Sequence, residues 1–151
     1  MSSTDDSKKN GRMMFVNLAV KDLNNTKEFF GKLGFAFNPM FTDENAACMI
    51  VNDGCSYVML LGEKFFKAFT PDREICDTKK NIECLVALSL DGRAQVDEMI
   101  EKAVAAGGSE YREKQDYGWM YSRAFRDVDG HIWELSYMDV NAIPEEMKKR
   151  G

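Results

Sequence analysis

Apolar and polar positions alternate with two different periods along the chain, and the order of those periods repeats. Residues 13–20 form a short apolar run that predicts a strand, and apolar side chains then recur at helical spacing up to Leu33. Asp22 or Asn24 is expected to cap this helix, and Gly34 to end it. Three strands are predicted next, at residues 35–42, 46–51 and 55–61.

The same order returns in the second half, after a short helix predicted at residues 63–69 and a polar connection at residues 70–80. A strand is predicted at residues 83–90 and a helix at residues 92–106. The apolar positions expected to share one face of that helix are Val96, Met99, Ile100, Ala103 and Val104. The last three predicted strands are residues 109–114, 120–126 and 131–137.

This repeat predicts an α+β fold of two βαβββ modules, residues 13–62 and 82–139, within a single domain of residues 13–139. The two modules are expected to form a cupped, half-open mixed β-sheet barrel with the helices on its outer face. Residues 1–12 are polar and are expected to form a disordered leader. Residues 140–151 form a polar tail that is expected to fray.

Composition narrows the range of partners. The 151 residues carry a net charge of −5 at pH 7, which argues against nucleic acid because phosphate binding needs a basic face. No apolar run approaches the roughly 18 residues that span a bilayer. The N-terminus also lacks the apolar core of a signal peptide, so a cytoplasmic location and no membrane partner are expected. The four cysteines form no C-x-x-C pair and are expected to be reduced.

Three stretches, taken in order, resemble one known family. Residues 15–23 and 28–35 look like that family's first strand and the end of its first helix, which has the form Phe-Tyr-x-x-Leu-Gly-Phe. Residues 96–108 resemble its second helix, with an Ala-Gly-Gly ending, and residues 125–135 resemble its Asp-x-Asp-Gly turn and final Glu-Leu strand. The chain thus resembles a divergent member of the vicinal oxygen chelate superfamily of glyoxalases, bleomycin resistance proteins and extradiol dioxygenases.

The resemblance implies a divalent metal on the floor of the cup, but the ligand positions do not support one. Phe15, Met59 and Leu85 fall where three of the family's four ligands would be, and only Glu134 keeps a ligand type. Tight binding of a carbonyl-activating metal takes about three nitrogen or oxygen ligands from the protein. The single histidine, His131, is expected in a turn. No metal or other cofactor is therefore predicted.

Strand alternation predicts which side chains line the cup if Glu134 faces it. The expected ligand-binding residues are Phe15, Asn17, Tyr57, Met59, Leu85, Trp119, Tyr121 and Glu134. Glu134 is the candidate catalytic residue, as a general acid or base, and is equally a candidate counter-charge for a cationic ligand. The alternative is a carboxylate already bonded to Tyr57, Asn17 or a nearby arginine. Residues 111–121 could form a lid, an exposed hairpin or a dimer contact.

Three functions remain open from the sequence. The first is a metal-free protein that binds a small apolar or cationic organic molecule, as drug-binding resistance proteins of the family do. The second is a lyase, isomerase or dioxygenase of glyoxalase type. It would be metal-free with Glu134 as base, or metal-dependent through a partner subunit or off-pattern residues such as Asp43, Glu44 or Asp116. The third is a protein-contact module with a filled cup. The resemblance also implies a homodimer.

Overall fold

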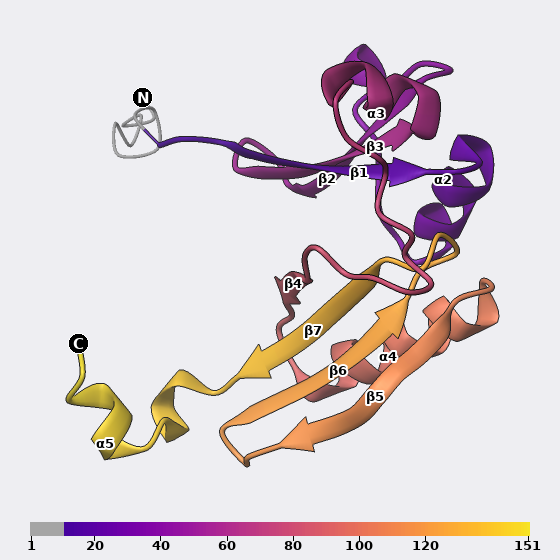
Figure 1. Cartoon of the computed structure of the whole chain (residues 1–151). Helices are drawn as coiled ribbons and strands as arrows, with labels where there is room; N and C mark the ends of the chain where they lie inside the picture. The colour runs from indigo at the N-terminus through magenta and orange to yellow at the C-terminus, as the bar shows by residue number, and fades with distance from the viewer. Residues whose placement is uncertain (1–10) are drawn as a thin grey trace, which may run out of the picture. The chain divides into compact units, whose positions relative to one another are not determined.

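The computed structural model of the chain describes residues 11–151, so most of the leader predicted at residues 1–12 lies outside it. The described part has an α+β fold with one sheet of three strands and one of four (Figure 1), which confirms the predicted fold class. The chain divides into two compact units. The first contains residues up to Lys27 together with Gly34–Ile75, and the second contains Glu28–Leu33 together with Cys76–Gly151.

The first unit contains the three-stranded sheet, in the order β1–β3–β2, with β1 parallel and β2 antiparallel to β3. Its elements are β1 (Met14–Val20), the beginning of α2 (Leu23–Lys32), the 3-10 helix η1 (Pro39–Phe41), β2 (Ala46–Asn52), β3 (Ser56–Gly62) and α3 (Glu63–Phe69). The Asp22 side chain accepts a hydrogen bond from the backbone N–H of Asn25 at 3.1 Å, so the first of the two predicted caps is the one used.

The strand predicted at residues 35–42 is wrong. Phe37 forms one isolated bridge to β2, and the chain then turns into η1. Pro39 has no N–H to donate to a ladder, and the Asn38 side chain accepts from the backbone N–H of Met40 at 3.0 Å. The local cap and the missing donor therefore end the strand after a single pair.

The second unit contains the four-stranded sheet, in the order β4–β7–β6–β5. Its elements are the end of α2, β4 (Val86–Ser89), α4 (Arg93–Ala105), β5 (Ser109–Asp116), β6 (Met120–Arg126), β7 (Ile132–Met138), η2 (Val140–Ala142) and α5 (Glu145–Lys148). β4 runs parallel to β7, and the other neighbours are antiparallel. The tail, predicted to fray, instead holds η2 and α5. The Asp139 side chain caps η2, and Pro144 precedes the first turn of α5.

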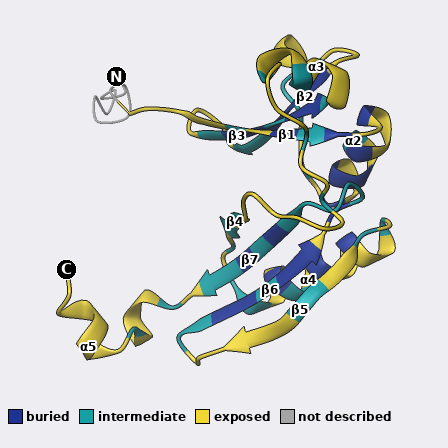
Figure 2. Ribbon diagram, viewed as in Figure 1, coloured by how far each residue is buried: buried dark blue, intermediate teal, exposed yellow. Residues whose placement is uncertain are grey.

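The core of the second unit lies between its sheet and the helices (Figures 1 and 2). Trp133 is fully buried, with its ring centroid 4.9 Å from that of Phe30 at the end of α2 and 6.2 Å from that of Phe125. Val96, Ile100 and Ala103 of α4 are buried, as their spacing predicted. Val104 was assigned to the same face, but its side chain is 49% exposed. The buried stripe of α4 is thus narrower than predicted.

The two units repeat one pairing scheme, and the register fixes which positions correspond. In β3, Met59 lies opposite Asn17 of the parallel edge strand β1. In β7, Glu134 lies opposite Ala87 of the parallel edge strand β4. Both inner strands also pair antiparallel with a neighbour on their other side. Burial aligns the two inner strands, because Met59 and Glu134 are each half-buried between two buried neighbours. With Met59 matched to Glu134, the register makes Phe15 equivalent to Leu85.

Both long helices end in the same way. Gly34 follows α2 with a φ of 99°, and Gly107 follows α4 with a φ of 110°. Only glycine adopts this backbone conformation without a steric cost, so each helix stops where the sequence predicted. Within residues 11–151, no helix is long and apolar enough to cross a bilayer.

Candidate functional site: a pocket around an arginine–glutamate pair

A pocket of about 570 Å³ opens on the second unit. Its walls come from three places: residues 82–85, which precede β4; Tyr111 and Arg112 in β5; and Ile132 and Glu134 in β7. Ile82 and Leu85 are both more than half exposed, so solvent reaches the apolar wall of the pocket. The volume lies in the range of sites that take small organic molecules.

An ion pair forms the polar part of this pocket. Arg112 donates from Nη2 to Oε2 of Glu134 across 2.8 Å, and the side chain of each is 25% exposed. The same nitrogen donates to Oγ of Ser122 at 3.2 Å, and the Ser136 hydroxyl donates to Ser122 at 3.2 Å. Three neighbouring strands thus contribute to one polar strip on the sheet.

The backbone at Arg112 is unusual. Its φ is 49°, and among residues 11–151 it is the only non-glycine residue with a positive φ. The register of β5 against β6 shifts between Tyr111 and Gln115, so Arg112 sits in a bulge. A bulge redirects a side chain that a regular strand would place elsewhere. Here the redirected guanidinium meets the carboxylate two strands away.

The pairing changes what Glu134 can do. The sequence left open a general base, a counter-charge for a cation, or a carboxylate bonded to a nearby arginine, and the structure has the last of these. Arg112 already donates to Oε2 of this carboxylate, so a substrate proton would have to compete with the guanidinium for Glu134. A cationic ligand would have to compete with Arg112 for the same carboxylate.

The residues present do not fit a chelated metal. Glu134 is the one ligand-type residue at a family position, and a guanidinium nitrogen lies 2.8 Å from it. Among the off-pattern candidates, Asp116 is paired with Arg93, and Asp43 accepts from two backbone N–H groups of its own turn. In the described part of the chain, no three His, Cys, Asp or Glu side chains come together as a ligand set.

Four of the predicted ligand-binding residues lie in the first unit. Phe15 stacks on Tyr57 with ring centroids 5.0 Å apart and planes 13° from parallel. The Tyr57 hydroxyl donates to Asp53 at 2.8 Å and accepts from the Gly54 N–H at 2.6 Å. Asn17, which is exposed, and Met59, which is half-buried, follow on the same face. Leu85 and Glu134 are the predicted residues that line the pocket.

Trp119 and Tyr121 lie away from the pocket lining. Tyr121 is 5% exposed and points toward α4, where its hydroxyl donates to Asp97 at 2.6 Å. It lies beside Ser122 in β6, and neighbouring residues of a strand face opposite sides of the sheet. Trp119 is half-buried at the end of the β5–β6 hairpin, where its carbonyl accepts from the Asp139 N–H at 2.7 Å.

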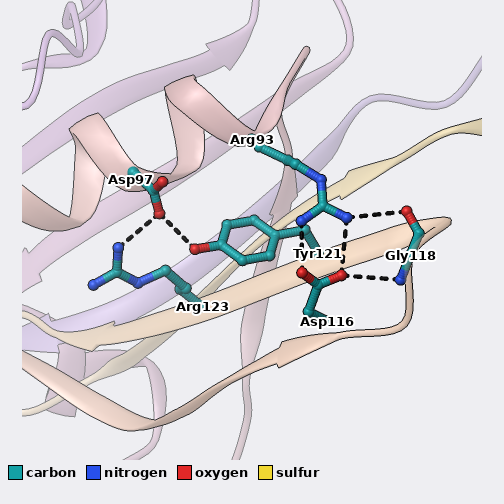
Figure 3. Close-up of polar contacts among 6 residues, drawn as sticks. All are labelled: Arg93, Asp97, Asp116, Gly118, Tyr121 and Arg123. Carbon is teal, nitrogen blue, oxygen red and sulfur yellow. Dashed lines mark hydrogen bonds and ion pairs between the residues drawn. The ribbon is translucent and has the colours of Figure 1, made fainter.

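The tip of that hairpin is tied to α4 (Figure 3). Arg93 donates to both carboxylate oxygens of Asp116, at 2.7 and 2.8 Å, and to the Gly118 carbonyl at 3.0 Å. Arg123 bonds Asp97 beside Tyr121 in the same cluster. The Arg93 hydrogen bonds, followed by the Gly118 N–H, hold the pKa of Asp116 well below its usual value. Of the three alternatives for residues 111–121, these contacts support an anchored hairpin.

Sequence reasoning missed Ile82, Glu83 and Cys84 as pocket residues, and it placed Tyr111 and Arg112 only in the possible lid at residues 111–121. A nearby arginine was expected as one partner for Glu134, but no local signal distinguished Arg112 from the other arginines of the chain. Burial, followed by the charges of Glu83 and Cys76, raises the pKa of the Cys84 thiol. Cys84 therefore contributes to the wall as a thiol.

Comparison with known proteins addresses the fold. Residues 12–52 match the family model described as bleomycin resistance protein-like N-terminal. A hypothetical protein from S. aureus has a similar structure, with a TM-score of 0.70 and 24% identity over 84% of this chain and 94% of that one. This chain has the fold of the glyoxalase/bleomycin resistance proteins. The predicted resemblance is thereby confirmed at the level of the fold.

Two further solved structures have the glyoxalase/bleomycin resistance fold. A glyoxalase-related enzyme from Fulvimarina pelagi matches with a TM-score of 0.69 and 22% identity, over 85% of this chain and 89% of that one. A fosfomycin resistance protein from Mesorhizobium loti matches with a TM-score of 0.60 and 16% identity, over 87% and 95%. A search of curated proteins found no match. At these identities the likeness concerns the fold.

Proposed function

We propose that this protein binds a small, largely apolar organic molecule in the pocket of its second unit, without a chelated metal. The observation that carries the proposal is the pocket itself, of about 570 Å³, with aliphatic and aromatic walls around the Arg112–Glu134 pair. Apolar walls with a few convergent polar groups are typical of small-molecule sites.

An enzyme of glyoxalase type has less support. A metal-free lyase or isomerase would need Glu134 to take a proton from the substrate, yet Arg112 donates to that carboxylate. A metal-dependent dioxygenase or lyase would need a set of converging ligands, and among the described residues no three His, Cys, Asp or Glu side chains come together as one. The homodimer and the cytoplasmic location stay predictions.

Binding is tested with an apolar fluorescent probe, N-phenylnaphthylamine, whose emission rises in an apolar environment. Leu85→Trp narrows the pocket, and Val104→Trp places the same side chain on α4. The two positions are matched, being 53% and 49% exposed. We expect about tenfold weaker probe binding in the Leu85 variant, because a filled site excludes the ligand, and no change in the Val104 variant. Equal binding by both variants, or none by the wild type, would contradict the proposal.

Metal dependence is tested by thermal melting after chelator treatment, with Zn²⁺, Ni²⁺, Mn²⁺ or Fe²⁺ added back. A ligand that binds only the folded state raises the melting temperature. We expect that no ion raises the melting temperature of the wild type in a way that Glu134→Ala abolishes. Stoichiometric metal that depends on Glu134 would put a chelate-type enzyme first.

A further inference from the structure

Placing the Arg112–Glu134 ion pair in an apolar pocket costs free energy. Both side chains are three-quarters buried, and removing an ion pair from water costs free energy that its mutual attraction only partly returns. The backbone at Arg112 adds a cost, because a φ of 49° is sterically unfavourable for a residue other than glycine. Two costs at one residue of a pocket wall point to a role in recognition.

We propose that this pair selects ligands with a neutral polar head that both donates and accepts hydrogen bonds, such as a primary carboxamide. The inference rests on the proposed binding function and names the ligand class for the same pocket. The apolar part of the ligand contacts the aliphatic wall made by Ile82, Leu85 and Ile132. The carboxamide oxygen accepts from Arg112, and its N–H donates to Glu134.

Charge balance disfavours an ionic head. A carboxylate attracted to Arg112 would face Glu134, and also Glu83 in the same lining. An ammonium attracted to Glu134 would face Arg112. Either ion would gain its full attraction only by separating the pair, which leaves one charge half-buried and unpaired. The lining carries two carboxylates and one guanidinium, so of the two ionic heads the ammonium should compete more strongly with a neutral head for the pocket.

A neutral head can bind without separating the pair. A guanidinium has five N–H donors and a carboxylate about four lone-pair sites. Arg112 donates to Glu134, to Ser122 and to the Glu113 carbonyl, which leaves two of its donors, and Glu134 accepts one of these bonds. The remaining donors and lone pairs are the complement of a carboxamide. Ser122 accepts from the same Arg112 nitrogen at 3.2 Å, which fixes the guanidinium from the side of β6. The pair is therefore held in place before a ligand arrives, which lowers the cost of binding.

The test uses three probes that share one ring system: naphthalene carboxamide, naphthalene carboxylate and naphthylmethylammonium. Their dissociation constants are measured at neutral pH, by nuclear magnetic resonance titration, for the wild type, Arg112→Asn and Glu134→Gln. Asparagine tolerates a positive φ better than most residues and is too short to reach Glu134, so Arg112→Asn is chosen to keep the backbone. The matched controls are Lys102→Asn and Glu98→Gln, which remove the same charges from an exposed ion pair on α4.

In the wild type and both controls, we expect the carboxamide to bind about tenfold more tightly than either ion, because it leaves the pair intact. The order should change in the variants. For Arg112→Asn, which leaves Glu134 without its counter-charge, the ammonium should be the tightest-binding of the three probes. For Glu134→Gln, which leaves Arg112 without its counter-charge, the carboxylate should be the tightest. Melting curves of each variant confirm that the protein is folded.

Other outcomes separate this inference from the function on which it rests. If a charged probe binds best to the wild type, the protein binds small molecules but the neutral-head inference is wrong. The inference is also wrong if the carboxamide is the tightest-binding probe for every variant, because the Arg112–Glu134 pair then has no part in selecting the ligand. If none of the three probes binds to any form, the inference and the proposed binding function both fail.

Discussion

The two sheets of this protein share one pairing order but differ at equivalent positions. In the first unit, Phe15 stacks on Tyr57, with ring centroids 5.0 Å apart, and Met59 follows on the same face. In the second unit the equivalent positions hold Leu85, Ile132 and Glu134, and these line a pocket.

The difference lies in size and in charge. Two stacked aromatic rings fill space that two aliphatic side chains leave open. A methionine needs no partner, whereas a half-buried carboxylate needs one, and the bulge in β5 supplies Arg112. In the first unit, the segment at the β5 position forms a single bridge and then turns into η1. One scaffold thus carries a stacked aromatic pair in one unit and a polar-floored pocket in the other.

The largest expected effect comes from giving the second sheet a core residue of the first. Val58 is equivalent to Trp133, whose side chain is fully buried and donates from Nε1 to Asp127 at 2.9 Å. Trp133→Val should lower the free energy of unfolding by about 3 kcal/mol, because it leaves a cavity and an unpaired acceptor. Urea denaturation measures the change. Trp133→Phe keeps a ring and should cost less. A loss below about 1 kcal/mol for Trp133→Val would contradict the core assignment.

The reverse exchange in the first sheet should have the next largest effect. Tyr57→Ile introduces the equivalent residue of the second sheet and removes both the stack on Phe15 and the hydroxyl bonds at Asp53 and Gly54. We expect a loss of about 2 kcal/mol in the free energy of unfolding. A double-mutant cycle with Phe15→Leu isolates the stack and should give a coupling of about 1 kcal/mol. Additive single effects would mean that the stack does not contribute.

A smaller effect is expected at the pocket floor. Glu134→Met introduces the residue found at the equivalent position of the first sheet and leaves the Arg112 guanidinium unpaired. Because Arg112 keeps its hydrogen bonds to Ser122 and to the Glu113 carbonyl, the loss should be only about 1 kcal/mol. Adding Arg112→Asn removes the unpaired charge and the strained side chain together. The double variant should therefore be more stable than Glu134→Met. A further loss would show that the Arg112 bonds to Ser122 and to the Glu113 carbonyl stabilise the fold by more than the unpaired charge destabilises it.

The smallest effect concerns the hydrogen bonds that join the tip of the β5–β6 hairpin to Arg93 of α4. The described part of the first unit has no such hairpin, because the segment at the β5 position forms only one bridge. Hydrogen bonds from Arg93, followed by one from Gly118, lower the pKa of Asp116. A lowered folded-state pKa adds stability above the unfolded value of about 4, and that stability is lost as the pH falls through the folded value. Asp116→Asn should therefore melt below the wild type at neutral pH, and the difference should shrink below about pH 4.

Melting curves across the acid range test this prediction. Arg93→Gln removes the charged guanidinium that bonds Asp116 and should reproduce the same pH profile. A difference that stays constant into the acid range would mean that packing at the tip, and not the charge of Asp116, stabilises the hairpin.

The sequence by itself determined most of the local structure. The Asn-Asp-Gly turn at residues 52–54, the glycines that end α2 and α4, and the apolar periods of the strands are signals carried by neighbouring residues. They were sufficient for the fold class and for the repeat. The resemblance also predicted that Phe15, Met59 and Leu85 stand at three of the family's metal-ligand positions, and this stays a prediction.

The tertiary structure decided the features that depend on distant partners. Glu134 pairs with Arg112 because the bulge in β5 sets the direction of the Arg112 side chain. Tyr121 was expected at the ligand site, but its hydroxyl bonds Asp97 on α4. Periodicity gives the alternation of faces along one strand. It does not give the strand register, the backbone shift at a bulge or the reach of a long side chain, and these place the charged pair in the pocket.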